Sequence, residues 1–179
     1  MSACVDAGPW AIRYVTGDAT RPKARENEHV ILPHVCNAVG GWGKGFVGPL
    51  GRRYPLAQAS YRAWYAGRLH NAPPFRLGAV LMVPVAPRLT IAHMIAQTFI
   101  KRGRTALIPL SYLALMECLE TVAKHAANDG ATLHMPRIGT GLAGGTWSEV
   151  GRTIENACAR HNVPVTVYTL TGDERPLGG

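Results

Sequence analysis

The chain has 179 residues, 47% of them apolar, which is enough for one hydrophobic core but too few for two comfortable domains. No apolar run approaches the roughly 18 residues of a membrane span, and the N-terminus lacks the basic start and apolar block of a signal peptide, so a cytoplasmic protein with no membrane partner is expected. The net charge of +8 attracts anions without choosing among nucleotides, nucleic acid and acidic protein tails. We expect a single domain over residues 1–179, with a core over about residues 11–170 and frayed termini.

Hydrophobic periodicity predicts strands and helices that alternate along the chain. Strands are expected at 11–15, 30–36, 78–85, 90–96, 132–135 and 163–170, and helices at 56–65, 111–127 and 147–160. Pro84, Pro87 and Arg88 indicate the turn of a hairpin between the third and fourth of these strands. The fold class is therefore α/β with a mixed sheet.

Two glycine-rich loops follow predicted strands. The first, residues 37–45, has four glycines within six positions, and the second covers residues 135–145. Loops at the carboxyl ends of strands are where open α/β sheets bind ligands, and glycine lets backbone N–H groups approach an anion closely. A phosphate-bearing ligand clasped by both loops is the first hypothesis, and a glycine-rich hairpin or mobile loop is the alternative.

The second loop leads into a helix start. Thr146 and Glu149 have the spacing of a capping box, in which the threonine hydroxyl accepts from the Glu149 N–H and the glutamate reaches back to the cap N–H. A helix is therefore predicted to begin at about Trp147. Its N-terminal N–H groups and macrodipole would add attraction for a diphosphate in the glycine loop.

The standard nucleotide motifs do not account for these loops. A P-loop requires a glycine at Ala38 and a serine or threonine at Gly45, so this reading fails. Residues 139–144 match the GxGxxG fingerprint literally, but the following predicted strand at 163–170 has no acidic residue to bind a ribose. A Rossmann dehydrogenase is a poor fit.

The cysteines and the basic residues carry weaker signals. The cysteines lie far apart without a CxxC pair, so neither a zinc site nor a disulfide framework is indicated, and reduced, mostly buried thiols are expected. They are Cys4, Cys36, Cys118 and Cys158. The basic residues form loose groups without interleaved aromatics, which favours a solvated basic face over a dedicated nucleic-acid platform. These groups are Arg21/Lys23/Arg25, Arg52/Arg53 and Lys101/Arg102/Arg104.

Three ordered motifs together resemble the macro domain family. They are residues 17–20 (GDAT), the loop 37–45 and residues 137–142 (RIGTGL), and the similarity covers about residues 11–170. The chain is most similar to the branch that contains terminal ADP-ribose protein glycohydrolase and DNA ADP-ribosyl glycohydrolases, especially in MPRIG, Trp147 and the final VYTL. The resemblance implies a three-layer α/β/α domain with a mixed, mostly six-stranded sheet that binds ADP-ribose.

The resemblance also implies roles for individual side chains. Asp18 would accept from the adenine amino group, or else be a turn or capping aspartate, and Tyr168 would cover the adenine, or else be a core tyrosine. Asn37 would hold the distal ribose hydroxyls or the attacking water, or else be a strand-end turn asparagine. Lys44 would add charge or point to solvent, and Trp42 would cover the ligand or pack in the core.

Backbone N–H groups of the second loop would bind the diphosphate, and those of the first loop would close from the other side. The complete implied ligand-binding set is Asp18, Ala19, Gly40, Gly41, Trp42, Gly43, Lys44, Gly45, Ile138, Gly139, Thr140, Gly141, Leu142 and Tyr168.

The chain departs from this branch at its catalytic pair. Ala143 stands where the branch has a catalytic aspartate, and the partner lysine aligns near Gln97. Hydrolysis would then use a water positioned by Asn37 and activated by the phosphate of the substrate, with His93 or Gln97 as further candidates. No metal and no cofactor are expected, and ADP-ribose would be the ligand and product.

We therefore expect a monomeric ADP-ribosyl hydrolase, a glycohydrolase without the usual Lys/Asp pair. It would release mono-ADP-ribose from acidic side chains of proteins or from thymidine in DNA, and the basic surface favours DNA. A non-catalytic reader of ADP-ribosylated partners is the main alternative, and an RNA-binding or phosphatase role is the third.

Overall fold

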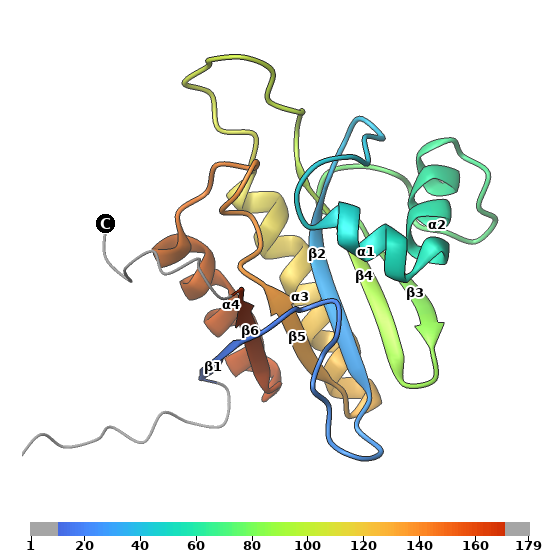
Figure 1. Ribbon diagram of the computed structural model, residues 1–179, viewed down its shortest axis with the longest axis vertical. Coiled ribbons are helices and arrows are strands. Elements are labelled where there is room, and N and C mark those ends of the chain that lie inside the picture. The colour runs from blue at the N-terminus through green and yellow to red at the C-terminus, as the bar shows by residue number, and fades with distance from the viewer. Residues whose placement is uncertain (1–10, 171–179) are drawn as a thin grey trace, which may run out of the picture.

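Six strands form one sheet in the order β1-β6-β5-β2-β4-β3 in the computed structural model, which describes residues 11–170 (Figure 1). All neighbouring strands are parallel except β3 and β4, which form an antiparallel hairpin at one edge. The strands are β1 (Ile12–Thr16), β2 (Val30–Asn37), β3 (Val80–Ala86), β4 (Leu89–Gln97), β5 (Thr132–Pro136) and β6 (Val165–Thr169). The predicted mixed, six-stranded α/β sheet is confirmed.

Helices cover both faces of this sheet. The helices are α1 (Val47–Arg53), α2 (Pro55–Tyr65), α3 (Tyr112–Asp129) and α4 (Trp147–His161). Buried side chains of α3 and α4 share the largest core cluster with strand residues, whereas α1 and α2 contribute to two smaller clusters on the opposite face. The three-layer α/β/α arrangement expected from the family resemblance is therefore confirmed (Figure 1).

The longest helix has the ends that its sequence predicts. Ser111 caps α3 by accepting a hydrogen bond from the Ala114 N–H at 3.3 Å, and Gly130 ends it in the left-handed conformation, with φ of 60°. Among residues 11–170, no helix is both long enough and apolar enough to cross a bilayer. The expected frayed termini and Cys4 lie outside the described residues.

Strand β2 lies between β4 and β5 and separates from β5 toward its carboxyl end. Its ladder with β4 runs from Val30 to Asn37, but its ladder with β5 includes only Val30 and Ile31. Pro33, two residues later, has no N–H to donate to a neighbouring strand. The space between the diverging ends of β2 and β5 opens toward the two glycine loops.

Three local expectations need correction. Pro84 lies inside β3 rather than in the hairpin turn, because β3 is an edge strand and tolerates a residue that cannot donate to a ladder. Helix α1 was not expected, since two glycines and a proline give its seven residues a low helix propensity. Helix α4 begins at Trp147 as predicted, but the Thr146 hydroxyl donates to Glu149 Oε2 at 2.9 Å instead of accepting from the Glu149 N–H.

Candidate functional site

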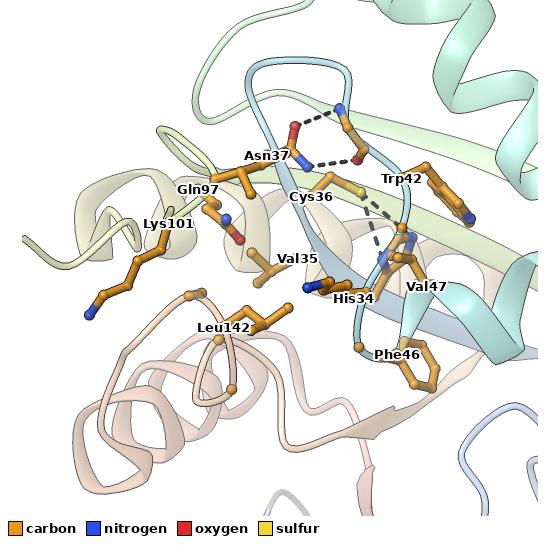
Figure 2. Close-up of a pocket in the computed structure, with 18 of the residues that line it drawn as sticks. His34, Val35, Cys36, Asn37, Trp42, Phe46, Val47, Gln97, Lys101 and Leu142 are labelled. Atoms are coloured by element: carbon orange, nitrogen blue, oxygen red, sulfur yellow. Dashed lines mark hydrogen bonds between the residues drawn. The ribbon is translucent and has the colours of Figure 1, made fainter. Parts of the chain in front are cut away.

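A cavity of about 660 Å³ opens at the carboxyl ends of β2, β4 and β5 (Figure 2). This volume lies within the range that holds small-molecule ligands. Both predicted glycine loops contribute to its wall, together with a third segment, residues 100–103, that follows β4. The expectation that the two loops lie on either side of one site therefore agrees with the tertiary structure.

Asn37 anchors the first loop through its side-chain amide. Its Oδ1 accepts from the Gly41 N–H at 2.9 Å, and its Nδ2 donates to the Gly41 carbonyl at 2.7 Å (Figure 2). The Oδ1 also accepts from the Val39 N–H at 3.2 Å. The Tyr61 hydroxyl also donates to the Asn37 carbonyl at 2.7 Å. Most of the bonding capacity of this amide is thus used inside the loop, which favours the strand-end turn asparagine over a side chain free to hold water.

The first loop needs glycine at two positions for conformational reasons. Gly40 and Gly45 have φ angles of 73° and 79°, which side chains with a Cβ rarely adopt. Trp42 lies between them, and its ring centroid is 5.7 Å from that of His34 and 5.5 Å from that of Tyr61. Because Trp42 also lines the cavity, both roles considered for it, packing on the core and facing a ligand, are compatible with its position.

The second loop is closed by its own backbone. The Gly145 N–H donates to the Gly139 carbonyl at 2.8 Å, and the Thr140 hydroxyl donates to the Arg137 carbonyl at 3.0 Å. The cavity wall includes Ile138, Gly139, Gly141, Leu142 and Ala143, but not Thr140. Residues 138–143 of the loop therefore present backbone and apolar surface to the cavity.

The charged side chains of the cavity wall are all basic. Lys44, Lys101, Arg102 and Arg137 line it, and no aspartate or glutamate does among the described residues. The guanidinium of Arg137 lies 5.5 Å from the ring centroid of Trp147, and its Nε is buried without a hydrogen-bond partner. A cavity with this lining suits an anionic ligand.

The two side chains to which the resemblance gives roles at the adenine do not line the cavity. Asp18 Oδ1 accepts from the backbone N–H and the hydroxyl of Thr20, at 2.9 and 2.8 Å, which makes it a turn aspartate. The side chain of Tyr168 is 3% exposed, and its hydroxyl bonds the Lys23 N–H and His134 Nδ1, each at 2.8 Å. These contacts are those of a turn aspartate and a core tyrosine, and the adenine roles of both residues stay predictions. Ala19 and Gly40 are likewise not in the cavity wall.

The two further catalytic candidates, Gln97 and His93, lie in different environments. Gln97 lines the cavity, and its Nε2 donates to the Phe99 carbonyl at 2.7 Å. His93 is fully buried behind the cavity wall, and burial lowers its pKa to about 3, so its imidazole is neutral. Of the two, only Gln97 is placed to touch a ligand.

Sequence reasoning missed three basic residues of this site. Lys101 and Arg102 were noted as a loose basic group, and Arg137 as part of a motif, but none was assigned to ligand binding. The available signal was that Lys101 and Arg102 lie a few residues after the carboxyl end of β4, which ends at Gln97, because this end of a strand is where open α/β sheets bind ligands.

Comparison with solved structures gives a clear relative. The chain is 46% identical to a macrodomain protein from Streptomyces coelicolor, with a TM-score of 0.75 over 88% of this chain and 98% of that one. No family model matches the sequence.

Curated proteins match this chain over segments of different length. The chromodomain-helicase-DNA-binding protein 1-like of Danio rerio is 32% identical over 171 residues, which is 91% of this chain but 16% of that protein. The chain thus spans about a sixth of the length of this relative. Human ADP-ribose glycohydrolase OARD1 is 39% identical over 61 residues, covering 34% of this chain and 40% of that protein.

Proposed function

We propose, because this chain belongs to the macrodomain family, that its cavity binds ADP-ribose, free or attached to a protein or to DNA. The observation that carries this proposal is a cavity between two glycine loops whose charged side chains are all basic. A diphosphate bears two negative charges and presents oxygens that backbone N–H groups and guanidinium groups bind well. The volume of about 660 Å³ leaves room for a ligand with a nucleoside at one end and a ribose at the other.

Binding without hydrolysis is the function that the geometry supports best. Hydrolysis needs a group that activates water or stabilises the charge that develops on the ribose. The described cavity wall has no carboxylate, Ala143 is a buried alanine, and most of the Asn37 amide is bonded inside its loop. These features favour a reader of ADP-ribosylated partners.

Hydrolysis is the second candidate, and the likeness to human ADP-ribose glycohydrolase OARD1 supports it. In that case the protein would release ADP-ribose from a glutamate or aspartate ester, or from thymidine in DNA. Water would be held near Gln97 and the Asn37 loop and activated by the phosphate of the substrate, since Gln97 is the remaining candidate in the cavity wall.

Calorimetry with ADP-ribose tests the binding proposal. We expect one molecule bound per chain, and a Lys101→Glu/Arg102→Glu variant that binds at least about tenfold more weakly, because two cations of the cavity wall become anions. Lys124→Glu, which reverses one charge at an exposed position on α3, is the control for a charge reversal outside the cavity. Equal affinity for the two variants and the wild type would refute a site in this cavity.

A turnover assay distinguishes the reader from the hydrolase. The purified protein would be incubated with a glutamate-linked mono-ADP-ribosylated protein and with a thymidine-linked ADP-ribosylated oligonucleotide while free ADP-ribose is followed. Release at catalytic amounts, lost in Asn37→Ala, would establish the hydrolase. Binding without release would establish the reader.

A further inference from the structure

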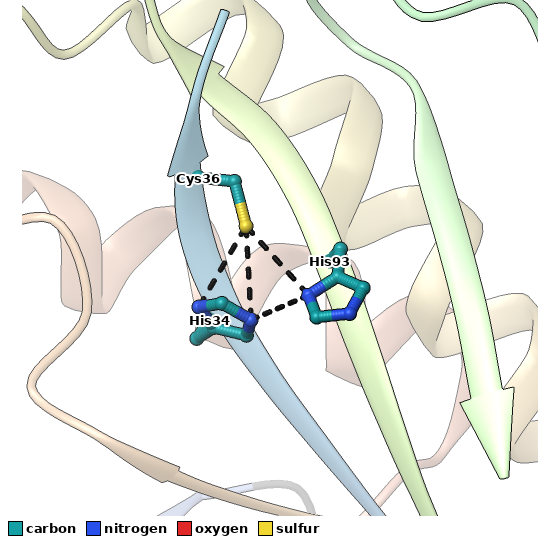
Figure 3. Close-up of side chains that lie close together, drawn as sticks. All are labelled: His34, Cys36 and His93. Atoms are coloured by element: carbon teal, nitrogen blue, oxygen red, sulfur yellow. Dashed lines mark hydrogen bonds between the residues drawn. The ribbon is translucent and has the colours of Figure 1, made fainter. Parts of the chain in front are cut away.

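Three side chains with metal-binding atoms meet beneath the cavity (Figure 3). His34 and Cys36 are two residues apart on β2, so their side chains lie on the same face of the sheet. His93 lies on β4 directly opposite His34 in the parallel register. The exposed fractions of His34, Cys36 and His93 are 2%, 3% and 0%, so all three are buried.

The distances within this cluster approach those of a tetrahedral zinc site. Cys36 Sγ lies 3.6 Å from His34 Nε2 and 3.8 Å from His93 Nδ1, while the two nitrogens are 2.7 Å apart. With Zn–S of about 2.3 Å and Zn–N of about 2.05 Å, tetrahedral angles place sulfur and nitrogen about 3.6 Å apart and the two nitrogens about 3.3 Å apart. The separation of the nitrogens must increase by roughly 0.6 Å. The His34 ring must also turn so that Nε2 faces the ion, because Sγ is almost equally far from its Nδ1, at 3.7 Å, and from its Nε2.

The side chains of the cluster have the chemistry of cation ligands. Neutral imidazole is the form of histidine that binds metals, and a divalent cation would favour the thiolate that burial alone disfavours.

We propose that His34, Cys36 and His93 bind one Zn²⁺. His34 would bind it through Nε2, His93 through Nδ1 and Cys36 as the thiolate, with release of the thiol proton to solvent. One thiolate and two imidazoles form a donor set that suits zinc and excludes the hard cations Mg²⁺ and Ca²⁺. His34 and Cys36 also belong to the cavity wall, so the fourth position is open to a water from that side.

This site goes beyond the proposed function, because zinc binding needs no ADP-ribose. It also departs from the expectation of no metal, which rested on cysteine spacing that indicates no zinc site and considered only cysteine pairs. The ion would join β2 to β4 one residue before Asn37, and it would hold the base of the first glycine loop. Zinc would therefore stabilise the fold around the ligand cavity.

Metal content and spectroscopy test the proposal on the intact protein. After incubation with zinc and desalting, mass spectrometry should find about one zinc per chain. At a free zinc concentration about a hundred times its Kd, Tm should rise by roughly 5–10 °C. Cobalt(II) in place of zinc should produce a thiolate-to-cobalt charge-transfer band and the intense visible absorption of a tetrahedral site.

Variants assign the metal to the cluster. Cys36→Ser and His93→Gln should each lose the bound zinc and the cobalt band. The controls are Cys158→Ser, which removes another buried cysteine, and His70→Ala, which removes an exposed histidine, and both should retain them. If Cys36→Ser does not fold, the His93→Gln variant and the wild-type cobalt spectrum decide.

Three outcomes would overturn the proposal. They are wild-type protein that retains less than a tenth of an equivalent of zinc, a cobalt spectrum without the thiolate band, and zinc retained in full by folded Cys36→Ser.

Discussion

At the scale of single residues, Asn37 shows how one side chain can determine the shape of a binding loop. Its Oδ1 and Nδ2 bond both the N–H and the carbonyl of Gly41, and Oδ1 also bonds the Val39 N–H. These bonds fasten the end of β2 to the loop that follows. Asn37, which was expected to act in catalysis, therefore holds the loop of the cavity wall in position in this structure.

We expect Asn37→Ala to lower the free energy of unfolding by about 2 kcal/mol, because it removes the three side-chain hydrogen bonds to loop backbone groups and leaves loop N–H groups unpaired. ADP-ribose affinity should fall about tenfold as the loop loses its shape. Denaturant unfolding and calorimetry measure the two effects. Val39→Ala, which trims a side chain that is 46% exposed in the same loop, should leave both unchanged. A stable Asn37→Ala protein with normal affinity would contradict the anchoring role.

His134 makes stability depend on pH at a second single position. It is 4% exposed, and burial lowers its pKa below the ordinary 6.5 even though Glu28, 3.8 Å away, acts to raise it. As the pH falls through 6.5, the unfolded chain takes up a proton at this residue before the folded chain does. The stability present above pH 6.5 is therefore lost as the pH falls toward the lower pKa of the folded state.

His134→Gln should remove this part of the acid sensitivity. The dependence of the free energy of unfolding on pH below 6.5 should become shallower by up to about 1.4 kcal/mol per pH unit. Urea unfolding at several pH values between 7.5 and 5 checks this, with His125→Gln, exposed on α3, as the control for loss of a histidine. An unchanged slope in His134→Gln would show that His134 does not titrate differently in the two states.

At the scale of elements, the second loop depends on close approach between two of its own backbone segments. A Cβ added to Gly145 would lie 2.8 Å from the Gly139 carbonyl oxygen and 2.4 Å from Leu110 Cδ2. A Cβ on Gly141 would meet nothing within 4 Å. The two glycines of one loop therefore differ in how tightly they are packed.

We expect Gly145→Ala to destabilise the protein by about 1–3 kcal/mol, because the loop must open to admit the methyl group. Gly141→Ala should change stability by less than about 0.5 kcal/mol. Denaturant unfolding measures the free energy of unfolding of both variants. Equal stability of the two variants would mean that the loop is not held in the closed form that the structure shows.

At the scale of the whole molecule, the net charge of +8 and the basic cavity wall act together on an anionic ligand. ADP-ribose affinity should fall about tenfold between 0.05 and 0.5 M salt, because the screening length shortens several-fold over this range. Calorimetry at both salt concentrations measures this, and adenosine, which has no phosphate, should bind with little salt dependence. A salt-independent affinity for ADP-ribose would mean that backbone donors rather than the basic residues bind the diphosphate.

The nature of the attached partner also belongs to this scale. If an ADP-ribosylated oligonucleotide is the preferred substrate or ligand, its binding should fall more steeply with salt than that of an ADP-ribosylated protein, because each phosphate contact releases counterions. The affinities of the oligonucleotide and of the protein would be measured in parallel over a range of salt concentrations. An identical dependence of affinity on salt would count against DNA as the preferred partner.

Sequence by itself determined the local features of this protein. The strands, three of the four helices and the two glycine loops follow from hydrophobic periodicity, caps and glycines, because each depends on residues that are close together in the chain. The position of the loops at strand ends also predicted the cavity, since parallel strands end at the same edge of a sheet.

Only the tertiary structure decided which distant side chains meet. His34 and His93 are 59 residues apart, and it is the pairing of β2 with β4 that brings their rings together. The same pairing carries Lys101 and Arg102 to the cavity, while the packing of β6 against its neighbours buries Tyr168 away from it. Strand pairing and burial are cooperative properties of the whole sheet, so no local pattern in the sequence encodes these contacts.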